Sequence, residues 1–132
     1  MNKFAMKKSR TLIVSNILTG AVAIVLILAG TLKLIGVGAE DMVEGLEKAR
    51  LIQHLSSISI AAIVCGILLL IPITKRFGFL TASSYWGGAI VAHLTYNDSF
   101  ALPVAFLAIL WLGIFLQSEL MRPRISNAPS QP

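Results

Sequence analysis

The chain has 132 residues, of which 56% are hydrophobic and only 13% are charged, and its mean hydropathy is +0.82. Soluble domains carry about 25% charged residues, so this composition excludes an ordinary soluble domain and is typical of a membrane protein. The net charge of +5 does not indicate nucleic acid as a partner, because the basic residues flank apolar runs instead of forming one solvated face. We expect the lipid bilayer to be the partner of the apolar surface of the chain.

Residues 1–10 contain four Lys or Arg and no acid, and we expect them to form a basic cytoplasmic tail. Residues 11–35 follow with the sequence TLIVSNILTGAVAIVLILAGTLKLI, which has one charge, Lys33, near its end. As a helix this stretch is about 37 Å long, enough to cross a hydrocarbon core of about 30 Å. A cleaved signal peptide has a shorter apolar run of about 7–15 residues, so we expect an uncleaved first span.

The only long polar stretch comes next and has the sequence AEDMVEGLEKARLIQHLS. Its apolar residues Met42, Leu46, Ala49 and Ile52 recur at helical spacing, opposite a charged face. This pattern predicts a short amphipathic helix lying along the membrane face, with a solvated loop as the alternative.

Three further apolar segments predict three more spans. Pro72 and a short basic turn separate the first two of these, which should therefore be antiparallel neighbours, and residues 97–99 form a second turn with helix-capping side chains. The predicted fold is all-α: an integral membrane four-helix bundle with one amphipathic interfacial helix. The expected spans are 11–35, 56–73, 77–96 and 100–120 within a domain of residues 11–121, followed by a disordered cytoplasmic tail at 122–132.

The distribution of charge predicts the orientation of these spans. The N-terminal tail, the turn before the third span and the C-terminal segment together carry eight Lys or Arg and one acid, whereas the two loops on the other side carry two basic residues and five acids. Lys and Arg are enriched in cytoplasmic loops, so both termini should be cytoplasmic.

Small residues at a spacing of four predict the faces along which the first three spans pack closely. The fourth span has mostly large apolar side chains and should face the lipid more. The three predicted stripes are Ser15-Thr19-Ala23, Ser57-Ala61-Cys65 and Ser84-Gly88-Ala92.

Ionisable residues within membrane spans are candidates for function. Lys33 lies just inside the non-cytoplasmic end of the first span, His93 lies at a similar depth in the third, and His54 precedes the second. We therefore expect all three at the non-cytoplasmic end. For Lys33, the alternative is that its ammonium extends to the membrane surface with its stem in lipid.

One face of the third span predicts the mouth of a pocket. Ala82, Trp86, Ala89, His93 and Tyr96 follow one another at spacings of three and four, with small residues below and polar aromatic residues above. Interfacial aromatics, and a histidine bonded to a neighbouring helix, are the plainer alternatives. The candidate ligand-binding residues are Lys33, His93, Trp86, Tyr96 and His54.

Other chemistries find little support in the sequence. The single cysteine, Cys65, excludes an intrachain disulfide and a CxxC pair, and no metal site is predicted. The motifs of P-loop proteins, α/β-hydrolases and zinc proteases are missing, and no catalytic residue can be named. Haem ligation by the two histidines is disfavoured, because His54 should lie at the interface.

Three motifs in a fixed order make residues 12–118 resemble the DoxX-like group of small four-span bacterial membrane proteins. They are LAGTLKL, which ends the first span, CGILLLIP with the basic turn after it, and GAIVAHL in the third span. Members often carry a glutamate early in the second span. The apparent equivalent here is Ile63, so an acid-dependent role is not carried over.

The resemblance implies a bacterial cytoplasmic (inner) membrane location and, for some relatives, an association with membrane redox complexes. Our first hypothesis is a redox-associated subunit that binds a quinone or similar apolar molecule, with Lys33 stabilising an anionic oxygen and His93 bonding a carbonyl or moving a proton. Because the chain has no evident electron carrier, a partner subunit or cofactor would be required, and an accessory role is favoured over a self-sufficient enzyme. The alternatives are a non-enzymatic assembly protein that docks a partner through residues 40–55 and, less favoured, a small-solute transporter; each is compatible with a homo-oligomer.

Overall fold

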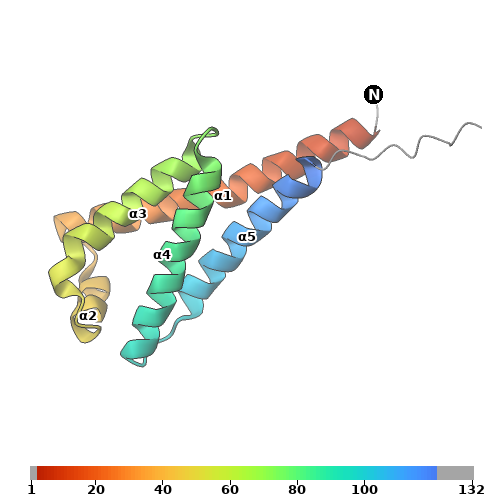
Figure 1. Ribbon diagram of the computed structural model, residues 1–132. Helices are drawn as coiled ribbons and strands as arrows, with labels where there is room; N and C mark the ends of the chain where they lie inside the picture. Colours follow the sequence, from red (N-terminus) through yellow and green to blue (C-terminus); the bar gives the residue numbers. More distant parts are fainter. Residues whose placement is uncertain (1–2, 122–132) are drawn as a thin grey trace, which may run out of the picture.

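The computed structural model describes residues 3–121, and this part of the chain is helical with no strand. The predicted all-α class is therefore confirmed (Figure 1). The expected tail at 122–132 lies outside the described residues. In chain order the helices are α1 (Lys3–Ile35), α2 (Glu40–Lys48), the 3-10 turn η1 (Ile52–His54), α3 (Leu55–Leu70), α4 (Lys75–Thr95) and α5 (Ala101–Met121).

The first helix is the longest element, with 33 residues. At 1.5 Å per residue it is about 50 Å long, more than the thickness of a hydrocarbon core. It starts well before Thr11, because the basic segment consists largely of residues that favour helices, such as Lys, Met and Ala. It ends at Ile35, and the next residue, Gly36, has a φ of +69°, which is accessible to glycine at little cost. The basic segment is thus a continuation of α1 from Lys3 on.

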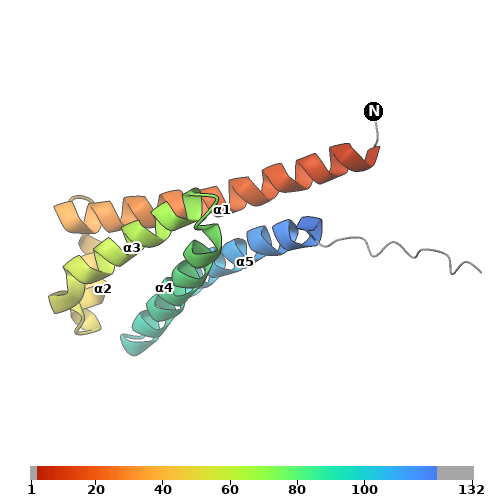
Figure 2. The same cartoon turned by 45° about the horizontal axis from the view of Figure 1, so that its top comes forward.

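The four long helices pack in a ring, in which α1 and α4 each contact α3 and α5. In two views related by a 45° turn, α3 lies along the second half of α1, and the N-terminal end of α1 extends past the end of α5 (Figures 1 and 2). The core lies inside this ring. Its buried hydrophobic residues are Val22, Ala23, Leu26, Ala62, Cys65, Leu69, Ala82, Trp86 and Leu110.

One close helix contact is the α1–α5 junction, formed by Ser15, Thr19 and Gly113. The Ser15 hydroxyl donates to the Gly113 carbonyl at 2.6 Å, and a Cβ on Gly113 would lie 2.8 Å from the Thr19 methyl carbon. Ser15, Thr19 and Ala23 are all at least 99% buried, which confirms the small-residue stripe predicted for the first span. Small residues let the two backbones approach closely, as helix packing in lipid requires.

The small-residue stripes predicted for the next two spans are wrong except at Cys65, which is buried. Ser57, Ala61, Ser84 and Gly88 are exposed. The reason is that these helices are apolar or small on every side, so the sequence pattern does not single out one face. The buried faces are instead Ser59, Ala62, Cys65, Gly66 and Leu69 on α3 and Gly78, Ala82 and Trp86 on α4.

Three helices of the described part are long and apolar enough to cross a membrane, which is typical of a membrane protein. They are the segments Met6–Ile35, Ile52–Leu70 and Ala101–Ser118. Helix α4 has 21 residues but is less apolar, because it begins with Lys75 and Arg76 and contains several Ser, Thr and Gly residues. Helix α4 therefore does not meet the criterion of length and composition, and the four-span bundle stays a prediction.

The segment after α1 is helical, as predicted, and not a loop. Helix α2 carries Glu40 and Asp41 in its first turn and Lys48 in its last, charges that suit the helix dipole. It packs beside the end of α4, where a Cβ on Gly45 would lie 2.9 Å from the Tyr96 hydroxyl oxygen. We call this part of the molecule, with the ends of α1 and α4, the α2 end.

Candidate functional site

Lys33 is the buried cation of the α2 end. Only 8% of it is exposed, and its ammonium donates a hydrogen bond to the Tyr85 hydroxyl at 2.9 Å. No carboxylate pairs with it among the described residues. A lysine that extended to the membrane surface would expose its ammonium, so the burial favours the inward-facing interpretation. A buried ammonium without a countercharge is costly, and such residues in membrane spans usually serve function.

Tyr85 of α4 is the partner that the sequence analysis missed. The Lys33 Nζ atom lies 5.7 Å from the centroid of its ring, on the side of the hydroxyl, and the ring meets the Trp86 ring edge-on with centroids 5.7 Å apart. The sequence offered a weak signal: Tyr85 lies next to Trp86, two turns before His93. Tyr85 lies to one side of the predicted pocket face, so helical spacing alone does not assign it to the pocket.

Trp86 lies in the core, as the predicted face of the third span implied. It is 8% exposed and stacks on Phe106 of α5, with ring centroids 4.9 Å apart. Its indole N–H is buried and has no hydrogen-bond partner in the described part of the chain. An unpaired buried donor costs about 1–3 kcal/mol, so this indole lowers the stability of the core.

His93 and Tyr96 belong to a second polar cluster at the α2 end. The His93 Nδ1 atom lies 3.0 Å from the Tyr96 hydroxyl oxygen and 3.3 Å from a carboxylate oxygen of Asp98. The half-buried imidazole is thus held by its own helix and by the following turn. Lys33 and His93 lie in separate clusters, and no hydrogen bond or ion pair joins them among the side chains that the structure describes.

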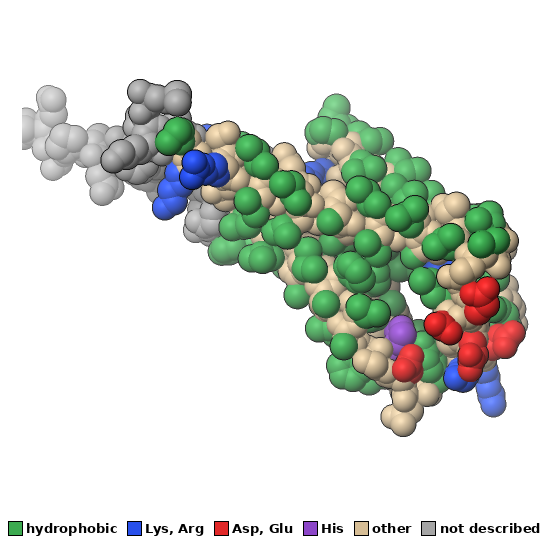
Figure 3. Space-filling model, turned by 180° about the vertical axis from the view of Figure 1, so that it is seen from behind, with side chains coloured by type: hydrophobic (Ala, Val, Ile, Leu, Met, Phe, Trp, Pro, Cys, Tyr) green, Lys and Arg blue, Asp and Glu red, His purple; other side chains and the backbone are tan. Residues whose placement is uncertain are grey.

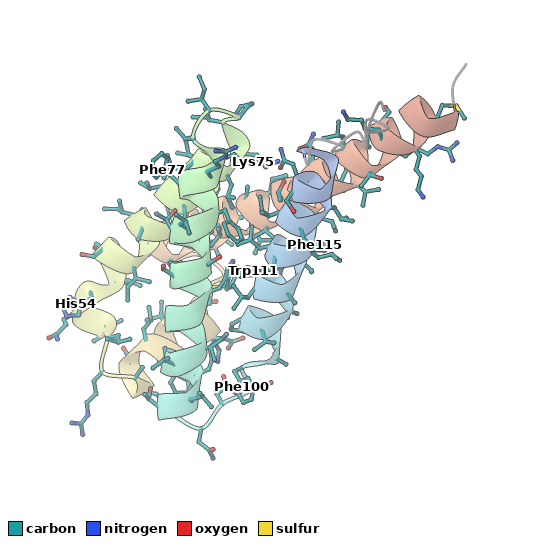
Figure 4. All side chains as sticks on the ribbon, turned by 45° about the vertical axis from the view of Figure 1, so that its right-hand side comes forward. His54, Lys75, Phe77, Phe100, Trp111 and Phe115 are labelled. Atoms are coloured by element: carbon teal, nitrogen blue, oxygen red, sulfur yellow. The ribbon has the colours of Figure 1, made fainter. Side chains whose placement is uncertain are left out.

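His54 lies apart from both clusters. It is exposed, its ring nitrogen lies 3.3 Å from the Gln53 amide nitrogen, and it points away from the helices (Figure 4). Of the five predicted site residues, the structure therefore places Lys33 and Trp86 on either side of Tyr85 and pairs His93 with Tyr96. It leaves His54 at the surface.

A hollow of about 520 Å³ opens beside Lys33, between the end of α1, helix α2 and the start of α3. Glu40, Glu44 and Glu47 line it together with the backbone of Gly36 and Ala39. Acidic side chains gather at this end of the molecule around an opening, whereas apolar side chains cover most of the remaining face (Figure 3). Acidic side chains thus line the hollow beside the lysine.

One of these glutamates is already paired. Glu44 accepts a hydrogen bond from Lys48 one turn further along α2, at 2.6 Å, and this bond raises the pKa of the Lys48 ammonium. Both side chains are more than half exposed, so the pair stabilises α2 only slightly. Among the described residues, no group of three or more His, Cys, Asp or Glu could hold a metal ion.

Comparisons of the chain with protein-family models, with curated proteins and with solved structures find no match. The resemblance to the DoxX-like group therefore remains a prediction from the three sequence motifs. What the chain does must be argued from its own residues.

Proposed function

We propose that the chain is a four-span protein of the bacterial cytoplasmic membrane that binds a quinone, or a similar apolar molecule with an acceptor oxygen, beside Lys33. The observation that carries the proposal is the Lys33 ammonium, which is buried among helices with a phenol as its hydrogen-bond partner. As in the DoxX-like proteins that it resembles, the role would be that of a redox-associated subunit.

Several features support four spans. Helix α4 packs between α3 and α5, both of which are apolar enough to cross a membrane, and at 21 residues it is about 31 Å long. Its start approaches the first half of α1, where Lys75 donates to the Asn16 side chain at 2.9 Å, and its later part approaches the end of α1 at Lys33. Helices α1 and α4 thus run in the same direction, as first and third spans must. The charge distribution supports cytoplasmic termini.

The chemistry available beside Lys33 suits an oxygen acceptor. An ammonium has three donors, and the bond to Tyr85 uses one of them. The remaining donors can bind a carbonyl oxygen or stabilise the anionic oxygen of a reduced head group. His93, within reach of Asp98, can exchange protons with the water-facing side. An electron carrier would have to come from a partner subunit or cofactor.

The test is the binding of decylubiquinone to purified protein in detergent, measured by the quenching of tryptophan fluorescence. Lys33→Met should weaken binding about 10-fold or more, because a hydrogen bond from a charged donor contributes about 1.5–3 kcal/mol. Tyr85→Phe should weaken it less. Lys48→Met is the matched control, since Lys48 is exposed on α2, and it should bind like the wild type. Equal affinity of wild type and Lys33→Met would refute the site.

A second function is favoured by the exposed apolar side of the α2 region. Met42 is 43% exposed and Ile52 is 38% exposed, beside a charged face that could dock a partner protein. If the chain is an assembly protein, Met42→Ser with Ile52→Ser should release a co-purifying membrane protein while quinone binding, if present, stays unchanged. Retention of that protein by the double variant would argue against docking through α2.

A further inference from the structure

A second hollow, of about 570 Å³, lies on the outer side of the contact between α3 and α4. We call it the α3–α4 groove. Its volume is within the range of about 300–1,000 Å³ that ligand sites have. It is lined by Ala61, Val64 and Cys65 of α3 and by Leu80, Ser84 and Tyr85 of α4.

The groove exists because small side chains lie where large ones would fill it. Ala61 and Ser84 are exposed on facing helices, and the exposed side chains of Val64 and Leu80 flank them. Small residues on membrane helices usually mark a contact with another helix. Here they leave a recess that opens toward the lipid, which explains why the predicted stripes containing Ala61 and Ser84 are not buried within the chain.

The groove offers only apolar contacts along its length. The Ser84 hydroxyl donates to the Leu80 carbonyl at 3.0 Å, and the neighbouring Thr81 hydroxyl donates to the Phe77 carbonyl at 3.0 Å. Both hydroxyls are therefore satisfied by their own helix and do not attract a polar ligand. A hydrocarbon chain is the occupant that this lining suits.

One side chain, that of Tyr85, contacts both the α3–α4 groove and Lys33. Tyr85 lines the groove, and its hydroxyl accepts the hydrogen bond from Lys33, which in turn lines the hollow on the water-facing side. A molecule whose polar head bonds to Lys33 beside Tyr85 can therefore place its tail between α3 and α4.

We infer that the α3–α4 groove binds the hydrocarbon tail of the ligand whose head group binds at Lys33, and that this ligand reaches the site from the lipid. The inference rests on the proposed function and adds to it the class of ligand: an amphiphile with one linear tail and an acceptor oxygen, not a water-soluble solute. The occupant that we propose is the tail of an isoprenoid quinone, and an acyl chain of a phospholipid in its place is an outcome of the test.

The experiment uses photo-crosslinking of the full chain in phosphatidylglycerol vesicles. One probe is a ubiquinone analogue with a ten-carbon tail that ends in a diazirine, and the other is a phospholipid with the same group on one acyl chain. Adducts are mapped by mass spectrometry of peptides. We expect the quinone probe to label residues 61–65 and 80–85 at least fivefold above the exposed faces of α1 and α5.

Filling the groove gives a matched pair of variants. Ala61→Phe should reduce labelling of the groove by the quinone probe at least threefold, whereas Ala108→Phe, which enlarges an exposed alanine on α5, should leave it unchanged. Duroquinone, which has no tail, should bind equally to wild type and to Ala61→Phe, because its head needs only Lys33 and Tyr85. A decrease in labelling with both variants would reflect misfolding and overturn the assignment.

The outcomes separate this inference from the proposed function. If decylubiquinone binds in a Lys33-dependent manner but the labels spread evenly over the lipid-facing helices, the site stands and the groove is not its tail subsite. If the phospholipid probe labels the groove and the quinone probe does not, the groove binds a tail and the quinone assignment fails. If both probes label the lipid-facing helices uniformly and no quinone binds, the groove inference and the proposed function are both overturned.

Discussion

The α1–α5 junction and the α2 end use the same helix, α1, in opposite ways. At the junction the buried polar group, the Ser15 hydroxyl, is matched by the Gly113 carbonyl, and small residues bring the backbones together. At the α2 end an ammonium is buried against a phenol, and an indole N–H next to that phenol has no partner in the described structure. The first arrangement is what stability alone requires, whereas the second costs stability, which is typical of a binding site.

The strongest way to test this comparison is to crowd the α1–α5 junction. Gly113→Leu should lower the free energy of unfolding by about 3 kcal/mol, because even a Cβ there would lie 2.8 Å from the Thr19 methyl carbon, which is buried. The control is Gly20→Leu on α1, where a Cβ meets nothing within 4 Å. Thermal unfolding in detergent micelles should show a large decrease in Tm for the first variant and little change for the second.

At the α2 end we expect a substitution to change the free energy of unfolding in the opposite direction. Lys33→Met removes a buried charge and keeps a similar volume, so it should raise the free energy of unfolding by about 1–3 kcal/mol while ligand binding is lost. Lys48→Met, at an exposed position, should change stability by less than about 0.5 kcal/mol. A Lys33→Met protein that is less stable than the wild type would show that the ammonium is structural, and the contrast between the two regions would disappear.

A smaller effect should distinguish a hydroxyl that joins two helices from one that does not. Ser15→Ala should cost about 1 kcal/mol, because it removes the bond to the Gly113 carbonyl of α5. Ser84→Ala removes a hydroxyl that bonds only within its own helix and should be close to neutral. Chemical unfolding of the two variants measures the difference. Equal losses would contradict the special role of the α1–α5 junction.

The smallest effect concerns the exposed ion pair on α2. The hydrogen bond from Lys48 to Glu44 raises the pKa of Lys48, so the pair stabilises the helix while Lys48 is protonated, and its contribution disappears as the pH rises through that pKa. Glu44→Gln should therefore lower the pKa of Lys48 toward its ordinary value. An NMR titration of the Lys48 side chain at alkaline pH checks this, and an unchanged pKa would show that the pair does not persist in solution.

Much of the helical architecture could be predicted, because long apolar runs and their breakers are local signals. The all-helical fold, the helical segment after the first span and the buried stripe from Ser15 to Ala23 all followed from composition and spacing. The packing faces of α3 and α4 could not be predicted. Their residues are apolar or small on all sides, so their orientation is decided by the partner helices.

The candidate site was predictable only in part, for a related reason. An intramembrane lysine is conspicuous in any sequence, and the face with Ala82 and Trp86 was found from spacing. The partner of Lys33 was not, because Tyr85 reaches it from the edge of that face, and such a contact depends on how two helices are rotated against each other. The exposure of His54 and the separation of His93 from Lys33 likewise depend on tertiary geometry.

The length of α1 has a consequence at the opposite, basic end of the chain. Lys7, Lys8 and Arg10 are exposed on a rigid extension of the first helix, so their positions relative to the rest of the molecule are fixed. Anionic lipid head groups attract such residues by about 1 kcal/mol each. Attraction transmitted through this helix acts on the whole protein, so the content of anionic lipid in the leaflet that the basic end contacts should influence the tilt and the depth of the protein in the bilayer.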